Sequence, residues 1–199
     1  MLINYNISSL VIDTLCKQAV EEKAAVACFY FDFAAQEEQS PDAILGSVLQ
    51  QVVGGLDEVP EKIVKAFGRR ERVVSNQKLA RSEIMKHLKD ATSSRPTFIC
   101  IDALDEYTAS HRVELLDLLN QILEKAPGTR LFLTGRPQIR SEVEEHLARK
   151  AAIRSITATR NDIVTFLRAK LKEDTMPDAM DESLEEEIVQ KIPETVSEM

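Results

Sequence analysis

Tryptophan is absent from this 199-residue sequence, and aromatic residues make up only 5% of it. No apolar stretch approaches the roughly 18 consecutive residues that a membrane-spanning helix needs. The first twenty residues also lack a basic segment followed by an apolar one, which is the pattern of a secretory signal. We therefore expect neither a membrane span nor a targeting segment.

Positively charged residues are fewer than negatively charged ones. The sequence has 25 Lys and Arg against 33 Asp and Glu, giving a net charge of −8 and a pI of about 5.1. No broad basic field is available to hold phosphate backbones or an anionic bilayer, so neither nucleic acid nor a membrane is an expected partner. The cysteines, Cys16, Cys28 and Cys100, are odd in number and far apart. This usage is typical of reduced thiols and predicts a cytoplasmic location.

Apolar periodicity predicts alternating helices and strands along the chain. In order, we expect a helix at 8–20, a strand at 24–33, a helix from 41 to the Gly54-Gly55 breaker, two helices within 57–93, a strand at 97–101, a helix at 110–125, a strand at 129–134, a helix from 137, a strand near 151–157 and a helix from 161. Such alternation with apolar strands indicates a parallel sheet covered by helices on both faces, a three-layer α/β sandwich. We expect strands 24–33, 97–101 and 129–134 to be adjacent, with 97–101 in the middle.

In the stretch FICIDALDEY, the apolar run that predicts a strand is followed at once by acidic residues. Asp102 ends this strand, and the next strand, LFLT, is followed by Gly135-Arg136-Pro137. In parallel sheets, ligands bind at the carboxyl ends of the strands. A carboxylate there can hold Mg²⁺, an arginine nearby can bind a terminal phosphate, and Asp105 and Glu106 are positioned to polarise a water.

A purely structural interpretation of the same residues stays open. Turns after strands favour Asp, and Asp105 and Glu106 suit the first turn of the following helix because of its dipole. Arg136 before a proline is also common in solvated loops. The pair Asp102 and Arg136 on consecutive predicted strands favours the functional interpretation over either residue alone.

Several segments together resemble one family. FICIDALDE resembles the Walker B signature of NACHT-type domains, and LFLTGRPQIRSEVEEHL resembles their sensor segment. FYFDFAAQEEQSPDAILGSVLQQV and DAMDESLEEEIVQKIPETVSEM are similar to segments of fungal NACHT proteins and of the related nephrocystin-like N-terminal domain. The resemblance implies a signal-transducing P-loop ATPase or GTPase of the STAND class, with an AAA-like core, Mg²⁺ and ATP or GTP. It also implies Asp102 as the metal ligand, Asp105 and Glu106 as water-activating acids, and Arg136 as the γ-phosphate sensor.

The sequence departs from that family at the phosphate-binding loop. It contains no GxxxxGK[ST], the motif whose backbone N–H groups and lysine hold the phosphates. ISSLVIDTL resembles the helix after that loop, so the missing lysine is expected near Asn4 or Tyr5. The preceding strand, which AAA-like sheets place between the sensor strand and the last strand, is missing too. We therefore expect an α/β/α P-loop NTPase sheet that is truncated at its N-terminus.

This comparison predicts two regions and a reduced activity. Residues 1–158 are expected to form a partial NACHT-type nucleotide-binding domain, and 159–199 a helical segment leading towards a missing helical or winged-helix region. The implied function is a nucleotide switch that does not work in the chain as given, with weak or no nucleotide binding. The expected partners are proteins, through family-type oligomerisation or through missing effector and repeat domains.

Two alternative functions remain open at this point. The chain is a degenerate NACHT-like scaffold without nucleotide chemistry, or it belongs to another P-loop ATPase such as a nucleic-acid motor, which the acidic balance disfavours. The histidines His87, His111 and His146 are far apart on predicted helices. Solvated or structural histidines are therefore favoured over zinc ligands.

Overall fold

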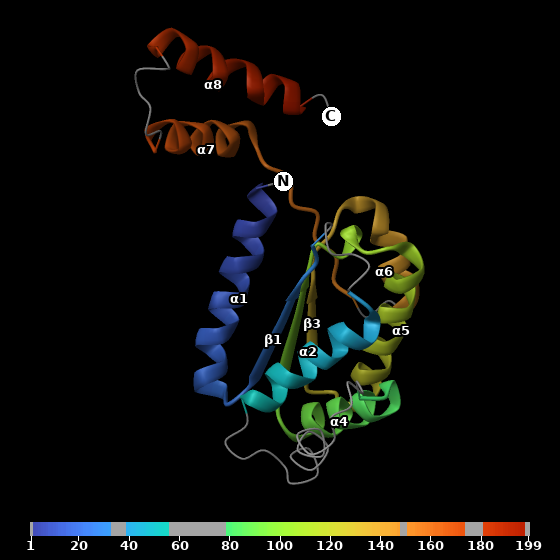
Figure 1. Ribbon diagram of the computed structural model, residues 1–199. Coiled ribbons are helices and arrows are strands. Elements are labelled where there is room, and N and C mark those ends of the chain that lie inside the picture. The colour runs from blue at the N-terminus through green and yellow to red at the C-terminus, as the bar shows by residue number, and fades with distance from the viewer. Residues whose placement is uncertain (1, 33–38, 56–78, 148–150, 174–180, 198–199) are drawn as a thin grey trace, which may run out of the picture. The chain divides into compact units, whose positions relative to one another are not determined.

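The computed structural model describes residues 2–32, 39–55, 79–147, 151–173 and 181–197 (Figure 1). Its helices are α1 (Leu2–Glu22), α2 (Pro41–Gly54), α4 (Arg81–Ser94), α5 (Ala109–Lys125), α6 (Arg140–His146), α7 (Arg160–Lys172) and α8 (Glu182–Ser197), with short 3-10 turns η2 (Leu104–Glu106) and η3 (Pro137–Ile139). The chain divides into two compact units, Met1–Ala151 and Ala152–Met199. No described helix is both long and apolar enough to cross a membrane.

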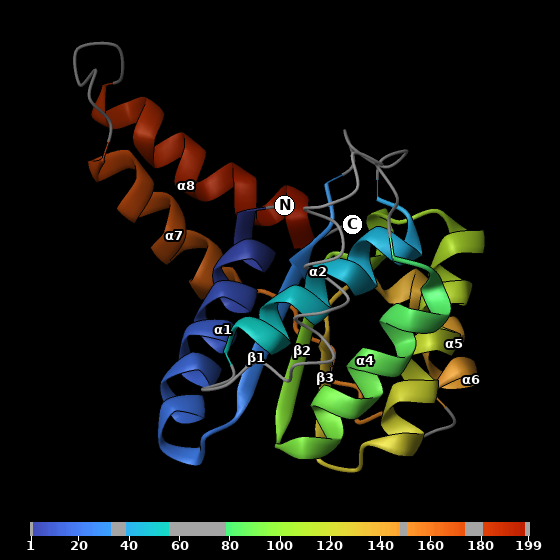
Figure 2. The ribbon, with the colours of Figure 1, turned by 60° about the horizontal axis from the view of Figure 1, so that its bottom comes forward.

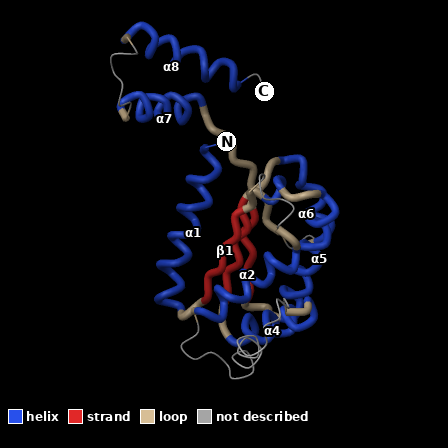
Figure 3. The backbone as a smooth tube through the Cα atoms, viewed as in Figure 1, coloured by secondary structure: helices blue, strands red, loops and turns tan. Residues whose placement is uncertain are grey.

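The first unit is built on a parallel sheet of three described strands (Figure 3). They are β1 (Ala25–Tyr30), β2 (Thr97–Asp102) and β3 (Thr129–Leu133), with β2 in the middle. The register pairs Ala25 with Thr97 and Tyr30 with Asp102 on one side, and Thr97 with Thr129 on the other. The predicted strand order and direction are confirmed.

Helices cover both faces of this sheet, which gives the three-layer α/β arrangement that the sequence predicts (Figure 2). Helix α1 packs on β1 and β2, whereas α2 packs on β1 and α5 on β3. Fully buried side chains of α2, α4, α5 and β2 meet between the sheet and its helices; they include Leu45, Leu49, Leu88, Ile99, Ile101, Leu115 and Leu119. Burial of this apolar surface is the main stabilising term of the unit.

Helix α2 shows how closely local signals match the structure. Ser40 caps it, with its side chain accepting a hydrogen bond from the Ala43 N–H at 3.2 Å, and Pro41 occupies the first turn. The cap satisfies an N–H that the helix itself cannot pair. The predicted start at Ser40-Pro41 and the predicted end at Gly54-Gly55 are both confirmed.

The strand predicted near 151–157 is wrong. Residues 151–159 form neither helix nor strand, and Ile156 is 71% exposed. A β-branched sequence favours extended backbone, but a strand exists only when a neighbour supplies its ladder hydrogen bonds. Of the two helices predicted within 57–93, the second is α4, whereas the first, carrying Ile63, Val64 and Phe67, lies outside the described residues.

The second unit contains α7 and α8, which pack against each other. A capping box starts α7, because the Thr159 hydroxyl accepts from the Asp162 N–H while the Asp162 carboxylate accepts from the Thr159 N–H. Ile163 is the buried apolar residue of α7. Two helices with so little buried surface form a marginal unit on their own.

Candidate site at the carboxyl edge of the sheet

The residues predicted to form the site come from two adjacent strands that end at one edge of the sheet. Strand β2 ends at Asp102, and β3 runs parallel to it with Leu133 paired to Ile101. Asp105 and Glu106 lie in η2, directly after β2, and Arg136 lies directly after β3, before η3. The carboxylates and the guanidinium therefore emerge at the same edge.

Asp102 is nearly buried, with 4% of its surface exposed. Its Oδ1 atom accepts hydrogen bonds from two hydroxyls, those of Ser8 in α1 and Thr134 after β3. Within the described part of the chain no donor contacts the other oxygen, Oδ2. Two hydroxyl donors orient the carboxylate, and they leave one oxygen for a further ligand.

This arrangement fits a single protein ligand of Mg²⁺. The described residues contain no group of three or more His, Cys, Asp or Glu side chains that could hold a metal ion. Mg²⁺ sites commonly use only one or two carboxylates and complete the octahedron with water and phosphate oxygens. Asp102 Oδ2 would be the protein's contribution, and the Ser8 and Thr134 hydroxyls would hold the carboxylate in place.

The turn after β2 is fixed by Thr134. The Ala103 N–H donates to the Thr134 hydroxyl at 3.0 Å, and the Leu104 N–H donates to the Thr134 carbonyl at 2.9 Å. Ala103 has a positive φ of 56°, in the left-handed region, where a Cβ atom costs about 1 kcal/mol. A small residue at this position keeps that cost low.

Asp105 and Arg136 form an ion pair and a hydrogen bond with each other. Asp105 Oδ1 accepts from the Arg136 backbone N–H at 3.1 Å, and Oδ2 lies 3.2 Å from Arg136 Nε. The Asp105 side chain is only 7% exposed, against 55% for Arg136. Gly135 permits this close approach, because a Cβ atom there would lie 2.6 Å from Ile139 Cδ1 and 3.3 Å from Asp105 Oδ1.

Another ion pair, in which the Arg112 side chain is nearly buried, supports the loop that carries Arg136. Arg112 of α5 donates from Nε and Nη2 to the two oxygens of Glu142 in α6, at 2.6 and 2.8 Å, and from Nη1 to the Tyr107 carbonyl at 2.6 Å. These hydrogen bonds lower the pKa of Glu142 and raise that of Arg112. The fork geometry holds α6, and with it η3, against α5.

Sequence reasoning missed Ser8, Thr134 and the Arg112–Glu142 pair. Thr134 carries a usable signal, because it is a polar residue at the end of an apolar strand and precedes a glycine. Ser8 carries none, since its partner Asp102 is 94 residues away. The contact exists because α1 packs along β2, which places the first described turns of α1 over the end of that strand.

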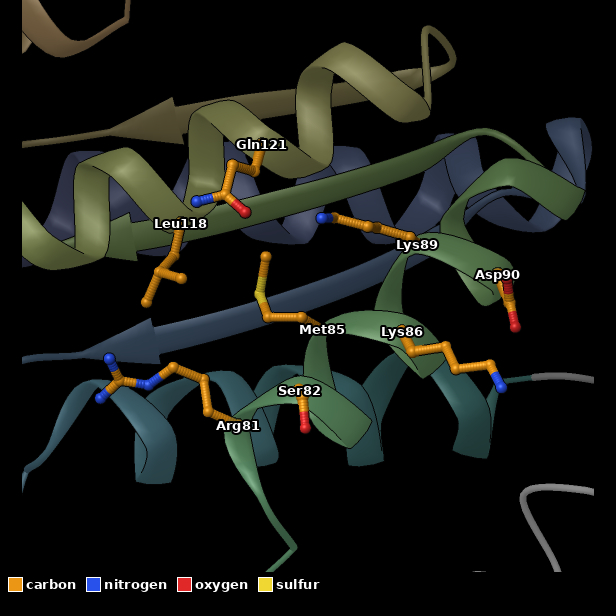
Figure 4. Close-up of a pocket in the computed structure, with 8 residues that line it drawn as sticks. All are labelled: Arg81, Ser82, Met85, Lys86, Lys89, Asp90, Leu118 and Gln121. Atoms are coloured by element: carbon orange, nitrogen blue, oxygen red, sulfur yellow. The ribbon is translucent and has the colours of Figure 1, made fainter.

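An open depression lies elsewhere, between α4 and α5 (Figure 4). The side chains of Met85 and Leu118 point into it, and Lys86 and Lys89 are among the polar residues along its sides. None of the residues discussed above as site residues lines it. Its position gives it no part in the chemistry of the sheet edge.

Fold and site together define a class, the three-layer α/β proteins with a P-loop-like parallel sheet. The sequence profile described as Nephrocystin 3, N-terminal, matches residues 6–136, which is more than half of the chain. The chain therefore belongs to the nephrocystin 3 N-terminal family. The matched range includes the residues of the sheet edge, Ser8, Asp102, Asp105, Glu106, Thr134 and Arg136, and leaves out Glu142.

Comparisons with other proteins add little to this. A comparison with curated proteins found no match. Among solved structures, the chain is similar to the Walker-type ATPase PABY2304 of Pyrococcus abyssi, with 14% identity and a TM-score of 0.41 over 85% of this chain and 53% of that one. The chain thus spans about half the length of that structure.

Proposed function

We propose that the chain is a partial NACHT-type nucleotide-binding signalling domain, the core of an ATP- or GTP-dependent switch, that does not bind nucleotide productively by itself. The observation that carries this proposal is Asp102. It is a nearly buried carboxylate at the end of the middle strand, oriented by two hydroxyls, with Arg136 at the end of the neighbouring strand. Membership of the nephrocystin 3 N-terminal family supports an NTPase-like domain of this kind.

The roles follow from position and contacts. Asp102 would hold Mg²⁺ through Oδ2, and the metal would neutralise phosphate charge there. Arg136, more than half exposed, would bind a terminal phosphate. Because both oxygens of Asp105 face Arg136, we assign Asp105 to holding the loop and Glu106, its neighbour in η2, to orienting water.

The missing element is the phosphate cradle. The sequence has no GxxxxGK[ST], so the backbone donors and lysine that hold the phosphates in this class are not supplied by that motif. Each lost charge-assisted hydrogen bond is worth about 1.5–3 kcal/mol. Several such losses remove binding at ordinary nucleotide concentrations, and without a fixed phosphate no attacking water is held in line.

Titration calorimetry with MgATP and with MgGTP, followed by a phosphate-release assay, tests this proposal. We expect very weak binding of both nucleotides and negligible turnover. Micromolar affinity or measurable turnover that Asp102→Asn abolishes, with an unchanged circular dichroism spectrum, would show that the site is complete and would overturn the proposal. Asp117→Asn, a change of the same type at an exposed position on α5, is the matched control.

A scaffold module without nucleotide chemistry is the second candidate, because it also predicts no binding. The two candidates differ when a cradle is supplied. If the genomic sequence upstream encodes, in frame, a strand followed by GxxxxGK[ST], the extended protein should bind MgATP or MgGTP, and Asp102→Asn should weaken that binding. No binding by the extended protein would favour the scaffold.

A further inference from the structure

The three free thiols of the chain belong to one side of the sheet, the side that α1 covers. Cys28 of β1 and Cys100 of β2 are direct partners in the parallel ladder, so their side chains share a face. Asp102, two residues after Cys100, shares this face and contacts Ser8 of α1. The third thiol, Cys16, lies in α1 itself.

Cys16 and Cys28 also lie at matching positions along the two elements. Helix α1 ends at Glu22 and β1 begins at Ala25, and the two run side by side in opposite directions (Figure 1). Cys16 stands six residues before the end of α1, which is about 9 Å along a helix. Cys28 stands three residues after the start of β1, which is about 10 Å along a strand.

The side of α1 that carries Cys16 is turned towards β1. Ser9 and Cys16 are seven residues apart in the helix, so they lie on nearly the same stripe of it. A side-chain hydrogen bond joins Ser9 to Tyr30 at the end of β1. Tyr30 and Cys28 are two residues apart in the strand and point to the same face. The stripe therefore places the Cys16 thiol beside Cys28.

The two thiols differ in exposure and therefore in reactivity. Cys16 is exposed, whereas Cys28 is half-buried. Burial raises the pKa of the Cys28 thiol, and the neighbouring Cys16 raises it further, so Cys28 stays protonated near neutral pH. An oxidant in solution reaches Cys16 first, and Cys28 is placed to react with the oxidised product.

Gln51 of α2 holds Cys28 in position. The backbone N–H of Cys28 donates to Gln51 Oε1 at 2.9 Å, and Gln51 Nε2 donates to the Cys28 carbonyl at 2.9 Å. The Cys28 Sγ atom lies 3.7 Å from the same Oε1 atom. The glutamine thus closes the outer backbone edge of β1 and fixes the strand beneath the thiol.

We propose that Cys16 and Cys28 form a redox-responsive pair, which hydrogen peroxide converts into an intramolecular disulfide. The peroxide transfers one oxygen to the Cys16 sulfur, giving a sulfenic acid, and leaves as water. The Cys28 sulfur then attacks the Cys16 sulfur, the S–O bond breaks, and the hydroxyl leaves as water with the Cys28 proton. The two thiols lose two protons and two electrons, and one peroxide becomes two waters.

The bridge would fix α1 against β1. Helix α1 carries Ser8, whose hydroxyl donates to Asp102, so oxidation would restrain the helix that orients this carboxylate. Cys100 takes no part, because it is only 1% exposed. A bridge from Cys28 to Cys100 also needs Cβ atoms about 3.8 Å apart, which is closer than the spacing of about 4.8 Å between neighbouring strands.

Mass spectrometry after mild oxidation tests the proposal. The reduced wild-type chain, at low protein concentration, is treated with a small excess of hydrogen peroxide, alkylated, and digested with trypsin without reduction. Lys17 and Lys23 lie between the first two cysteines, and further basic residues precede Cys100, so each cysteine falls in its own peptide. We expect a cross-link between the Cys16 and Cys28 peptides that dithiothreitol reverses, with Cys100 recovered as an alkylated thiol.

Amide hydrogen exchange gives an independent readout of the same bridge. Exchange of the α1 amides around Cys16 should slow roughly tenfold on oxidation and recover on reduction. Cys16→Ser, at an exposed position, should show neither the cross-link nor the slowing, whereas Cys100→Ala should behave like the wild type.

The wild-type cross-link decides the question even if a variant fails to fold. A bridge between Cys28 and Cys100, a bridge between two chains through Cys16, or oxidation of Cys16 without any bridge would each overturn the proposal. Three thiols that all stay reduced under peroxide would overturn it too.

Discussion

The two flanks of the sheet, the outer strands β1 and β3 with the residues around them, differ in how far they are buried. On the β1 flank, α2 buries residues such as Leu49 completely, and Gln51 closes the backbone edge. On the β3 flank, Leu131 and Leu133 are only partly buried, and the Arg136 loop is held by polar contacts. The strand with the partly exposed side chains thus leads into the loop that carries Arg136, as expected when a rigid scaffold positions functional loops.

Truncating an apolar side chain on each flank should give the largest contrast. Leu49→Ala removes a fully buried side chain and should lower the free energy of unfolding by about 2–5 kcal/mol. Leu133→Ala, at a partly exposed position, should cost about 1 kcal/mol or less, because less apolar area returns to water. Urea denaturation of both variants measures the difference, and equal losses would show that the two flanks contribute alike.

Ionisation of the thiol on the middle strand should give the next largest effect. Burial raises the pKa of Cys100 to about 12, while the unfolded thiol keeps a pKa near 9. Between these values the unfolded state loses its proton first, so the stability that is present below pH 9 falls as the pH rises. The loss reaches about 1.4 kcal/mol at one pH unit above 9.

Comparing the wild type with Cys100→Ala isolates this effect from the other groups that titrate at high pH. The variant should show a shallower decline in stability above pH 9, measured from urea midpoints. Identical slopes would show that Cys100 is not shielded from solvent. Cys28 on the edge strand also has its pKa raised by burial. Because it is only partly buried, we expect Cys28 to be alkylated faster than Cys100.

Removing the Gln51 side chain tests whether it closes the outer backbone edge of β1. Gln51→Ala leaves the Cys28 N–H and C=O without their partner and should cost about 1–2 kcal/mol. The Cys28 amide should then exchange much faster, whereas Gln50→Ala, at the exposed neighbouring position, should change neither quantity. An unchanged Cys28 exchange rate in Gln51→Ala would show that something other than the glutamine closes this edge.

The sequence predicts most of this fold because its local signals agree. Apolar runs of strand length, the Ser40-Pro41 cap and helical periodicity each define one element, and helical crossovers bring parallel strands side by side. The segment 151–157 contains three β-branched residues, Ile153, Ile156 and Thr157, but forms no strand. Composition reports what a residue tolerates, whereas a strand also needs a neighbour with unpaired backbone groups in reach.

The site was only partly predictable, for a related reason. Asp102 and Arg136 are readable because each follows a strand, and parallel strands end at one edge. The hydroxyl of Ser8 reaches Asp102 only through the packing of α1. The engagement of Asp105 with Arg136 depends on a turn at Gly135, and the sequence does not determine its geometry.

The smallest effect is expected at the ion pair between Asp105 and Arg136, on the β3 flank. Asp105→Asn removes the charge that faces Arg136 Nε but keeps an oxygen that can accept from the Arg136 N–H, now 3.1 Å from Asp105 Oδ1. Because Arg136 is 55% exposed, solvent screens the pair, and its loss should cost no more than about 1 kcal/mol. Glu114→Gln, which removes a carboxylate partner of Arg81 at another place, controls for the general change in charge.

The informative measurement is the Nε–H signal of Arg136 in NMR spectra, because stability alone will barely change. In the wild type, added inorganic pyrophosphate must compete with Asp105 for the guanidinium; in Asp105→Asn this competition is absent, so the signal should shift at lower pyrophosphate concentration. Glu114→Gln should respond like the wild type. If all three proteins respond alike, Asp105 does not restrain Arg136.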